Sequence, residues 1–150
     1  MNNFEEMKPV DILLVEDSPG DADLAKEALE DSKLKNTLYT VADGEAALDF
    51  LYKRPPYENV PRPDLILLDL NLPKKDGREV LKEIKEHPDL KRIPVVVLTT
   101  SRAEEDILKT YNLHANCYIA KPLDLNKFLE VVKTIENFWM SIVVLPKDPK

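Results

Sequence analysis

The chain has 150 residues, of which 43% are hydrophobic and 33% charged, and its formal net charge at pH 7 is −7. This composition is typical of one globular domain, and a chain this acidic is not expected to bind nucleic acid through its phosphates. No apolar run is long enough to span a membrane, and the N-terminus does not resemble a secretory signal. The single cysteine cannot form an internal disulfide. For these reasons we expect a cytoplasmic protein.

The first half of the chain predicts two strands, two helices and a loop. In chain order these are a strand at 11–15, a helix after Ser18-Pro19, a strand at 38–42, a helix at 45–52 and a proline-rich surface loop at 53–63. Ser18 suits a helix cap and Pro19 a first helical turn. The residues expected on the packed face of the first helix are Leu24, Ala25, Ala28 and Leu29.

The second half continues the alternation of apolar runs with helical patterns. It predicts a strand at 65–68, a helix from Asp76-Gly77 to about His87, a strand at 94–98, a helix at 104–113, a strand at 117–120 and a helix at 123–139. Apolar strands separated by helices are typical of a parallel sheet that is covered on both faces. We therefore expect an α/β fold.

Polar residues follow the expected strands. Glu16 and Asp17 follow the first strand, Asp69 the third, Thr99 the fourth and Lys121 the fifth. The carboxyl ends of parallel strands lie along one edge of a sheet, so these side chains are expected to converge. Three close carboxylates repel one another unless a cation lies between them, and oxygen ligands suit Mg²⁺. Such a site would let Asp69 accept a phosphoryl group, with Lys121 and Thr99 binding its oxygens.

Each of these residues also has an ordinary structural interpretation. An aspartate at a strand end often caps a helix or a turn, Thr99 would cap the next helix, and a single lysine is usually a solvated charge. The functional interpretation is favoured because the residues occur together at successive strand ends.

Four segments resemble the receiver domain of two-component response regulators over about residues 9–138. They are LLVEDS (13–18), LILLDLNLPKKDG (65–77), VVVLTTS (95–101) and YIAKPL (118–123). Residues 56–81 and the Phe138-Trp139 pair are similar to the single-domain regulators that partner cyanobacterial phytochromes. The resemblance implies a flavodoxin-like sheet of order 2-1-3-4-5 with five helices. It also implies a single receiver domain, 1–150, with a core at about 9–138 and a short apolar extension at 139–150.

The same resemblance implies a set of Mg²⁺ ligands. Asp17 and Asp69 would bind the ion directly, Glu16 would bind it through water, and Asn71 would contribute its backbone carbonyl. Glu16 stands where many receiver domains carry aspartate, a difference that bears on metal geometry.

The resemblance further implies a phosphorylation switch. Asp69 would be the phosphoacceptor, Thr99 and Lys121 would bind the phosphoryl group, and Thr99 with Tyr118 would form the switch pair. A histidine kinase, such as a phytochrome-type photoreceptor kinase, would donate the group. The altered surface would then contact a downstream protein, because the chain carries no output domain of its own.

Two other classes of function compete with the switch. A phosphatase of the haloacid dehalogenase type also forms an aspartyl phosphate, but it needs a second aspartate two residues later, where this chain has Asn71. A phosphate-independent binding module would be favoured if Asp17, Asp69 or Lys121 were missing, and all three are present.

The C-terminal residues are more apolar than a five-stranded domain requires. They include Phe138, Trp139 and the run at 142–145. The residues themselves leave two alternatives open: the segment folds back over the core, or it forms a homodimer interface together with the fourth helix and fifth strand. The resemblance favours the dimer.

Overall fold

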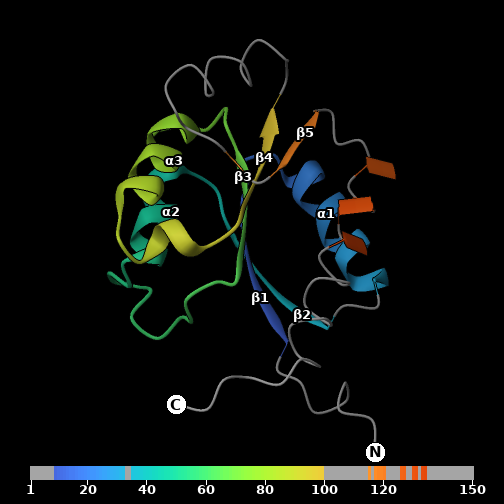
Figure 1. Cartoon of the computed structure of the whole chain (residues 1–150), viewed down its shortest axis with the longest axis horizontal. Helices are drawn as coiled ribbons and strands as arrows, with labels where there is room; N and C mark the ends of the chain where they lie inside the picture. The colour runs from blue at the N-terminus through green and yellow to red at the C-terminus, as the bar shows by residue number, and fades with distance from the viewer. Residues whose placement is uncertain are drawn as a thin grey trace, which may run out of the picture.

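A parallel sheet of five strands runs through the part of the molecule that the computed structural model describes, namely residues 9–32, 35–99, 115, 117–120, 126–127, 130–131 and 133–134. Its strands are β1 (Val10–Val15), β2 (Asn36–Val41), β3 (Leu65–Asp69), β4 (Val95–Thr99) and β5 (Cys117–Ala120). They lie in the order β2-β1-β3-β4-β5 (Figure 1). This confirms the expected parallel sheet and its strand order.

Among the described residues, three α-helices and a short 3-10 helix lie between the first four strands of the chain. They are α1 (Pro19–Asp31), α2 (Gly44–Leu51), α3 (Gly77–Glu86) and η2 (Leu90–Arg92). Ser18, Asp43 and Asp76 cap the three α-helices, each accepting a hydrogen bond from a backbone N–H of the first turn. The helix expected at 104–113 and most of the one expected at 123–139 lie outside the described residues. Within the described chain, no helix combines the length and apolar character needed to cross a bilayer.

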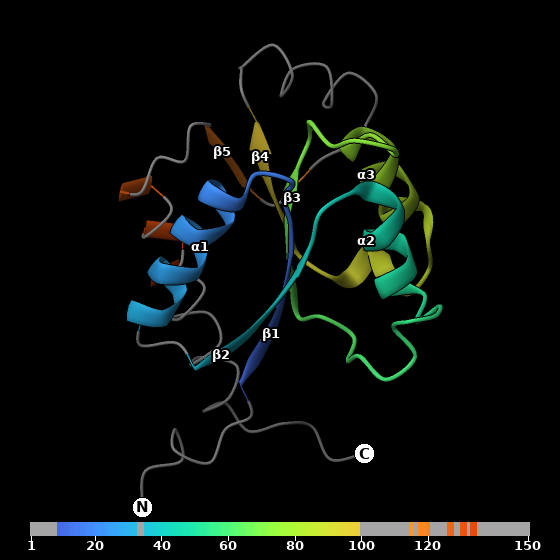
Figure 2. The ribbon, with the colours of Figure 1, turned by 180° about the vertical axis from the view of Figure 1, so that it is seen from behind.

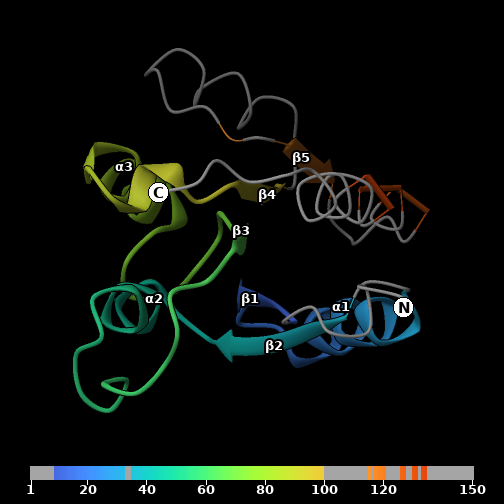
Figure 3. The same cartoon turned by 60° about the horizontal axis from the view of Figure 1, so that its bottom comes forward.

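Helices cover both faces of the sheet. Helices α2 and α3 lie on one side and α1 on the other, as the views from behind and from below show (Figures 2 and 3). Successive residues of a strand point to opposite faces, so Leu13 and Leu68 pack in the cluster under α2 and α3, whereas Leu14 and Leu67 pack with α1. Each face therefore has its own hydrophobic layer, and the sheet is buried between them.

The packed face of α1 is narrower than the sequence predicts. Ala25, Ala28 and Leu29 are buried as expected, but Leu24 is 41% exposed. A helix turns about 100° per residue, which places position 24 at the margin of the stripe formed by positions 25, 28 and 29, about 40° beyond position 28 and about 90° from the centre of the stripe. The expectation that Leu24 packs against the sheet was therefore wrong.

The proline-rich segment after α2 is a surface loop that packs back onto the domain. The centre of the Tyr57 ring lies 5.5 Å from the centre of the Phe50 ring in α2. Arg62 donates a hydrogen bond to the backbone carbonyl of Asp89, with a length of 2.9 Å. At its far end, Asp64 accepts a bond from the backbone N–H of Asp11. These contacts agree with the loop interpretation of residues 53–63.

Candidate functional site

The carboxyl ends of β1 and β3 bring three acidic residues together. Val15, the last residue of β1, is paired with Leu68, so the residues that follow these two, Glu16 and Asp69, lie side by side. Glu16, Asp17 and Asp69 each offer a carboxylate oxygen, and these oxygens all lie within 4.8 Å of one another. The predicted convergence of these three residues is confirmed.

Asp69 is fully buried at the last position of β3. Its Oδ1 accepts a hydrogen bond of 2.9 Å from the backbone N–H of Asn71, because the chain turns back over the carboxylate immediately after the strand. The backbone N–H of Leu70 continues the pairing with β4 by donating to the carbonyl of Leu98. The strand thus fixes the backbone of Asp69, and the turn orients its side chain.

Glu16 and Asp17 differ in their environment. Glu16 is 3% exposed, and its Oε2 accepts a hydrogen bond of 3.2 Å from the backbone N–H of Ser18, just before α1. Asp17 is exposed to solvent. One carboxylate is therefore held inside the cluster, while its neighbour lies at the opening.

The loop after β3 closes tightly over the site. Gly77 begins α3, and its N–H donates to the carbonyl of Leu70 with a length of 3.1 Å. A β-carbon at position 77 would collide with the backbone carbonyl of Asp69 and would lie 2.6 Å from the α-carbon of Leu70. The residue must therefore lack a side chain for α3 to start this close to the acidic cluster.

Thr99 and Tyr118 share one face of the sheet. Thr99 is buried at the end of β4, and Tyr118 pairs with Val97, two residues earlier on that strand. Because side chains alternate with a period of two, Thr99 and Tyr118 are diagonal neighbours on the side of α2 and α3. The hydroxyl of Tyr118 accepts a bond of 3.1 Å from the N–H of Ala115. Lys121, the remaining predicted site residue, lies outside the described residues.

The donor set suits a hard divalent cation. Three carboxylates contribute oxygen ligands and up to three negative charges, and the turn at Asn71 passes directly over Asp69. Mg²⁺ is typically held by one or two carboxylates while it keeps water and phosphate oxygens in its other positions. The residues present therefore fit a magnesium ion.

Comparison with known proteins assigns the family. The sequence model of the response regulator receiver domain matches residues 12–133. The chain belongs to the response regulator receiver domain family. As a receiver domain it is a signalling switch rather than a metabolic enzyme, which removes the phosphatase alternative.

Several relatives resemble this receiver domain along nearly their whole length. Response regulator Rcp1 of Synechocystis sp. is 56% identical over 142 residues, which cover 95% of this chain and 97% of Rcp1. The structure of the phosphorylated cyanobacterial phytochrome response regulator RcpA is 54% identical, with a TM-score of 0.76 and coverage of 93% of this chain and 100% of RcpA. The Mn²⁺-bound form of Rcp1 gives the same TM-score and coverage at 56% identity.

A second group of polar contacts near the site was not predicted from the sequence. Lys75, in the loop after β3, contacts Glu83 of α3, and Glu83 in turn contacts Tyr52 at the end of α2. The sequence contains Lys75 within LNLPKKDG, but a lysine in a polar turn is normally interpreted as solvated. Glu83 lies 8 residues from Lys75 and 31 residues from Tyr52, and no local pattern connects the three.

Proposed function

We propose that the chain accepts a phosphoryl group on Asp69 from a histidine kinase and thereby changes a protein-binding surface. The observation that carries the proposal is the buried Asp69 carboxylate, oriented by the Asn71 N–H beside Glu16 and Asp17 in a chain of the receiver family. In the transfer, an oxygen of Asp69 attacks phosphorus, the bond from phosphorus to the donor nitrogen breaks, and its electron pair stays on the donor histidine. The product on the chain is an aspartyl phosphate.

The acidic cluster is the proposed magnesium site. Asp17 and Asp69 bind the ion directly, Glu16 binds through water, and Asn71 contributes its backbone carbonyl. A bound Mg²⁺ supplies positive charge that offsets the charge of the incoming phosphoryl group. The close carboxylate oxygens and the Mn²⁺-bound form of the relative Rcp1 support this assignment.

The proposed readout of phosphorylation uses Thr99, Tyr118 and Lys121. The Thr99 hydroxyl and the Lys121 ammonium group bind oxygens of the phosphoryl group, and Tyr118 responds to the movement of Thr99. The shared sheet face of Thr99 and Tyr118 supports a direct coupling between them. Phosphorylation shifts the population of two states only by the contacts that it adds in one of them.

The proposed partners follow from the relatives. RcpA is a cyanobacterial phytochrome response regulator, and its 54% identity to this chain supports a phytochrome-type histidine kinase as the phosphoryl donor here. Location in the cytoplasm belongs to the same proposal, and the single cysteine of the chain supports it. The output is then contact with a downstream protein.

A homodimer is the proposed assembly, formed through the fourth helix, the fifth strand and the apolar residues 139–150. The apolar sequence of residues 142–145 supports it, since a contact between two chains would remove these side chains from water. Truncation after Asn137 should convert a dimer to a monomer in light scattering. Full-length protein that is already a monomer, or a truncated chain that remains a dimer, would contradict this interface.

Incubation with acetyl phosphate tests the proposed function. With Mg²⁺ present, intact-mass measurement should show a gain of one phosphoryl group, and chelation of the metal should reduce labelling to the background level. The Mg²⁺ dependence follows from the repulsion between the carboxylates and the incoming phosphate. Failure of the wild-type chain to gain mass, both from acetyl phosphate and from a phosphorylated phytochrome-type kinase, would refute the proposal.

A further inference from the structure

The loop between β3 and α3, residues 70–76, is held in place by side chains that lie outside the acidic cluster. At its C-terminal end, Lys75 donates a hydrogen bond of 3.0 Å from Nζ to Oε1 of Glu83 in α3. Glu83 Oε2 accepts a second bond, of 2.8 Å, from the hydroxyl of Tyr52. The guanidinium of Arg54 lies 4.6 Å from the centre of the Tyr52 ring. We call Tyr52, Glu83 and Lys75 the clamp.

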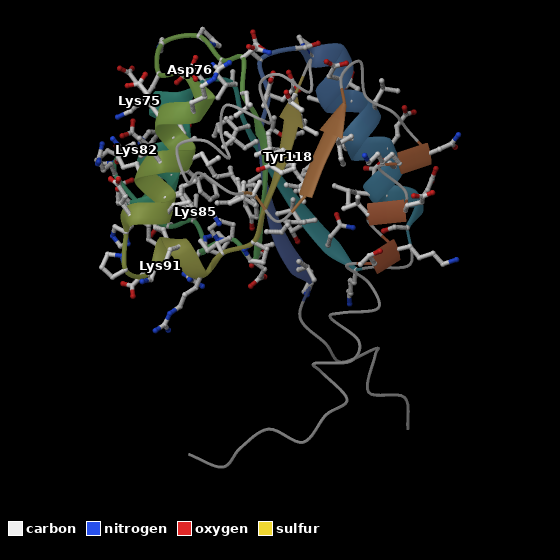
Figure 4. All side chains as sticks on the ribbon, turned by 45° about the horizontal axis from the view of Figure 1, so that its top comes forward. Lys75, Asp76, Lys82, Lys85, Lys91 and Tyr118 are labelled. Carbon is white, nitrogen blue, oxygen red and sulfur yellow. The ribbon has the colours of Figure 1, made fainter. Side chains whose placement is uncertain are left out.

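The clamp extends along α3 from the end that is nearest the acidic cluster. Lys75 and Asp76 lie together at this end, whereas Lys91 lies beyond the opposite end of the helix (Figure 4). Glu83 lies in the second half of α3, and the centre of the Tyr52 ring lies 5.7 Å from that of His87, which ends the helix. The hydrogen bond from Lys75, and to a smaller extent the one from Tyr52, holds the pKa of the Glu83 carboxyl below its usual value. Glu83 is therefore charged at neutral pH, with both oxygens engaged, and it connects α2, α3 and the loop.

The loop backbone also needs external support. Lys74 has a φ of 64°, in the left-handed region that non-glycine residues rarely adopt. Its Nζ lies 3.8 Å from Oδ2 of Asp43, the cap of α2. The carbonyl of Lys75 packs against Gly44, where a β-carbon would collide with it. Such a conformation persists when surrounding contacts enforce it, and these contacts all come from α2 and α3.

The other end of the same loop forms part of the phosphorylation site. The N–H of Asn71 orients Asp69, and the carbonyl of Leu70 is held by the N–H of Gly77. Only three residues separate Asn71 from Lys75, so a shift of the clamped end is transmitted to the backbone at Asn71 through a short stretch of chain.

We propose that the clamp positions the loop for metal binding, so that Lys75 and Glu83 set the affinity of the acidic cluster for a divalent cation through the backbone of Asn71. They are positioning residues, because they act through the loop and do not touch the reacting atoms. The inference rests on the proposed function insofar as it takes Asn71 to be a ligand. It adds a determinant of the site outside the acidic cluster, in the contact between α2 and α3.

A purely structural role for the clamp predicts a different result. The side chains of Lys75 and Glu83 are 32% and 37% exposed, and ion pairs this accessible to water contribute little to the free energy of unfolding. Substitutions in the clamp should therefore change the free energy of unfolding very little. What it does fix is the local position of the loop, and metal affinity reports that position directly.

The test measures Mn²⁺ affinity by electron paramagnetic resonance in the full-length chain, together with hydrogen exchange of the loop. Glu83→Gln and Lys75→Met should each weaken Mn²⁺ binding by about three- to tenfold, less than the roughly 10- to 100-fold seen for direct partners of metal ligands. Exchange should accelerate at Asn71 and Gly77. Lys75→Arg, which keeps the charge, should restore most of the affinity.

Asp49→Asn is the matched control. Asp49 pairs with Arg54 at 3.0 Å and borders the same open groove of about 440 Å³ that Lys75 and Glu83 line. Its substitution removes a charge from this groove and removes neither of the two hydrogen bonds of the clamp, so Mn²⁺ affinity should stay at the wild-type value.

Either of two results would overturn the inference: unchanged Mn²⁺ affinity and loop exchange in both clamp variants, or an equal loss of affinity in Asp49→Asn. Weakened Mn²⁺ binding in the clamp variants alone supports it even if the wild-type chain gains no phosphoryl group. That last observation would count against the proposed function only.

Discussion

Asp69→Asn should abolish phosphoryl incorporation from acetyl phosphate. The amide has nearly the same shape as the carboxylate and can still accept the hydrogen bond from the Asn71 N–H. It is not a nucleophile, however, so no aspartyl phosphate can form at this position. Intact-mass measurement after incubation with acetyl phosphate and Mg²⁺ should therefore show only the unmodified chain.

A matched charge change separates this effect from general electrostatics. Asp49→Asn also removes one negative charge, but from the exposed ion pair with Arg54 at the end of α2. It should be labelled at the wild-type rate. Labelling of Asp69→Asn at a comparable level would mean that another residue accepts the phosphoryl group, and peptide mapping would locate that residue.

The sequence predicted the strands well where burial defines them. Strands β3 and β4 are continuously apolar up to their last residue, as is typical of strands buried on both faces, so their apolar runs predicted their bounds within one residue. Strand β2 lies at the edge of the sheet and is only partly buried, and it begins at Asn36 rather than at Leu38. Its start is set by backbone pairing with β1, which the hydrophobic pattern does not report.

The acidic part of the site was predictable because it follows from topology. Once parallel strands are expected, residues at their carboxyl ends must lie near one another, whatever their separation in sequence. Asp69 and Thr99 prove to be the last residues of their strands rather than the first residues after them. They belong to the strands because backbone hydrogen bonding to the neighbouring strand, rather than side-chain polarity, decides where a strand ends.

The clamp could not be predicted in the same way. Its three residues, Tyr52, Glu83 and Lys75, come from three different elements. Each is of a type that is common at solvent-facing positions. Their contact depends on how α2 and α3 pack side by side and on the left-handed backbone at Lys74. Such long-range polar contacts follow from tertiary structure, and a local pattern of residues does not encode them.

Gly77→Ala should destabilise the domain and slow phosphorylation together. The added methyl group meets backbone atoms of Asp69 and Leu70, which cannot move aside like the end of a flexible side chain. Overpacking of this kind costs about 1–3 kcal/mol in the free energy of unfolding. Because the displaced backbone belongs to the phosphoacceptor itself, labelling by acetyl phosphate should also slow by about 10- to 100-fold.

Gly20→Ala provides the comparison for this substitution. Gly20 lies in the first turn of α1, and a β-carbon built there meets nothing within 4 Å. Alanine there should leave the stability unchanged or raise it by up to about 1 kcal/mol, since alanine is the better helix former. Urea unfolding and the labelling rate, measured on both variants, separate the steric effect at Gly77 from the general effect of replacing a helical glycine. Equal behaviour of the two variants would contradict the close approach of α3 to Asp69, whereas slow labelling of Gly77→Ala alone would tie the reactivity of Asp69 to the position of its own backbone.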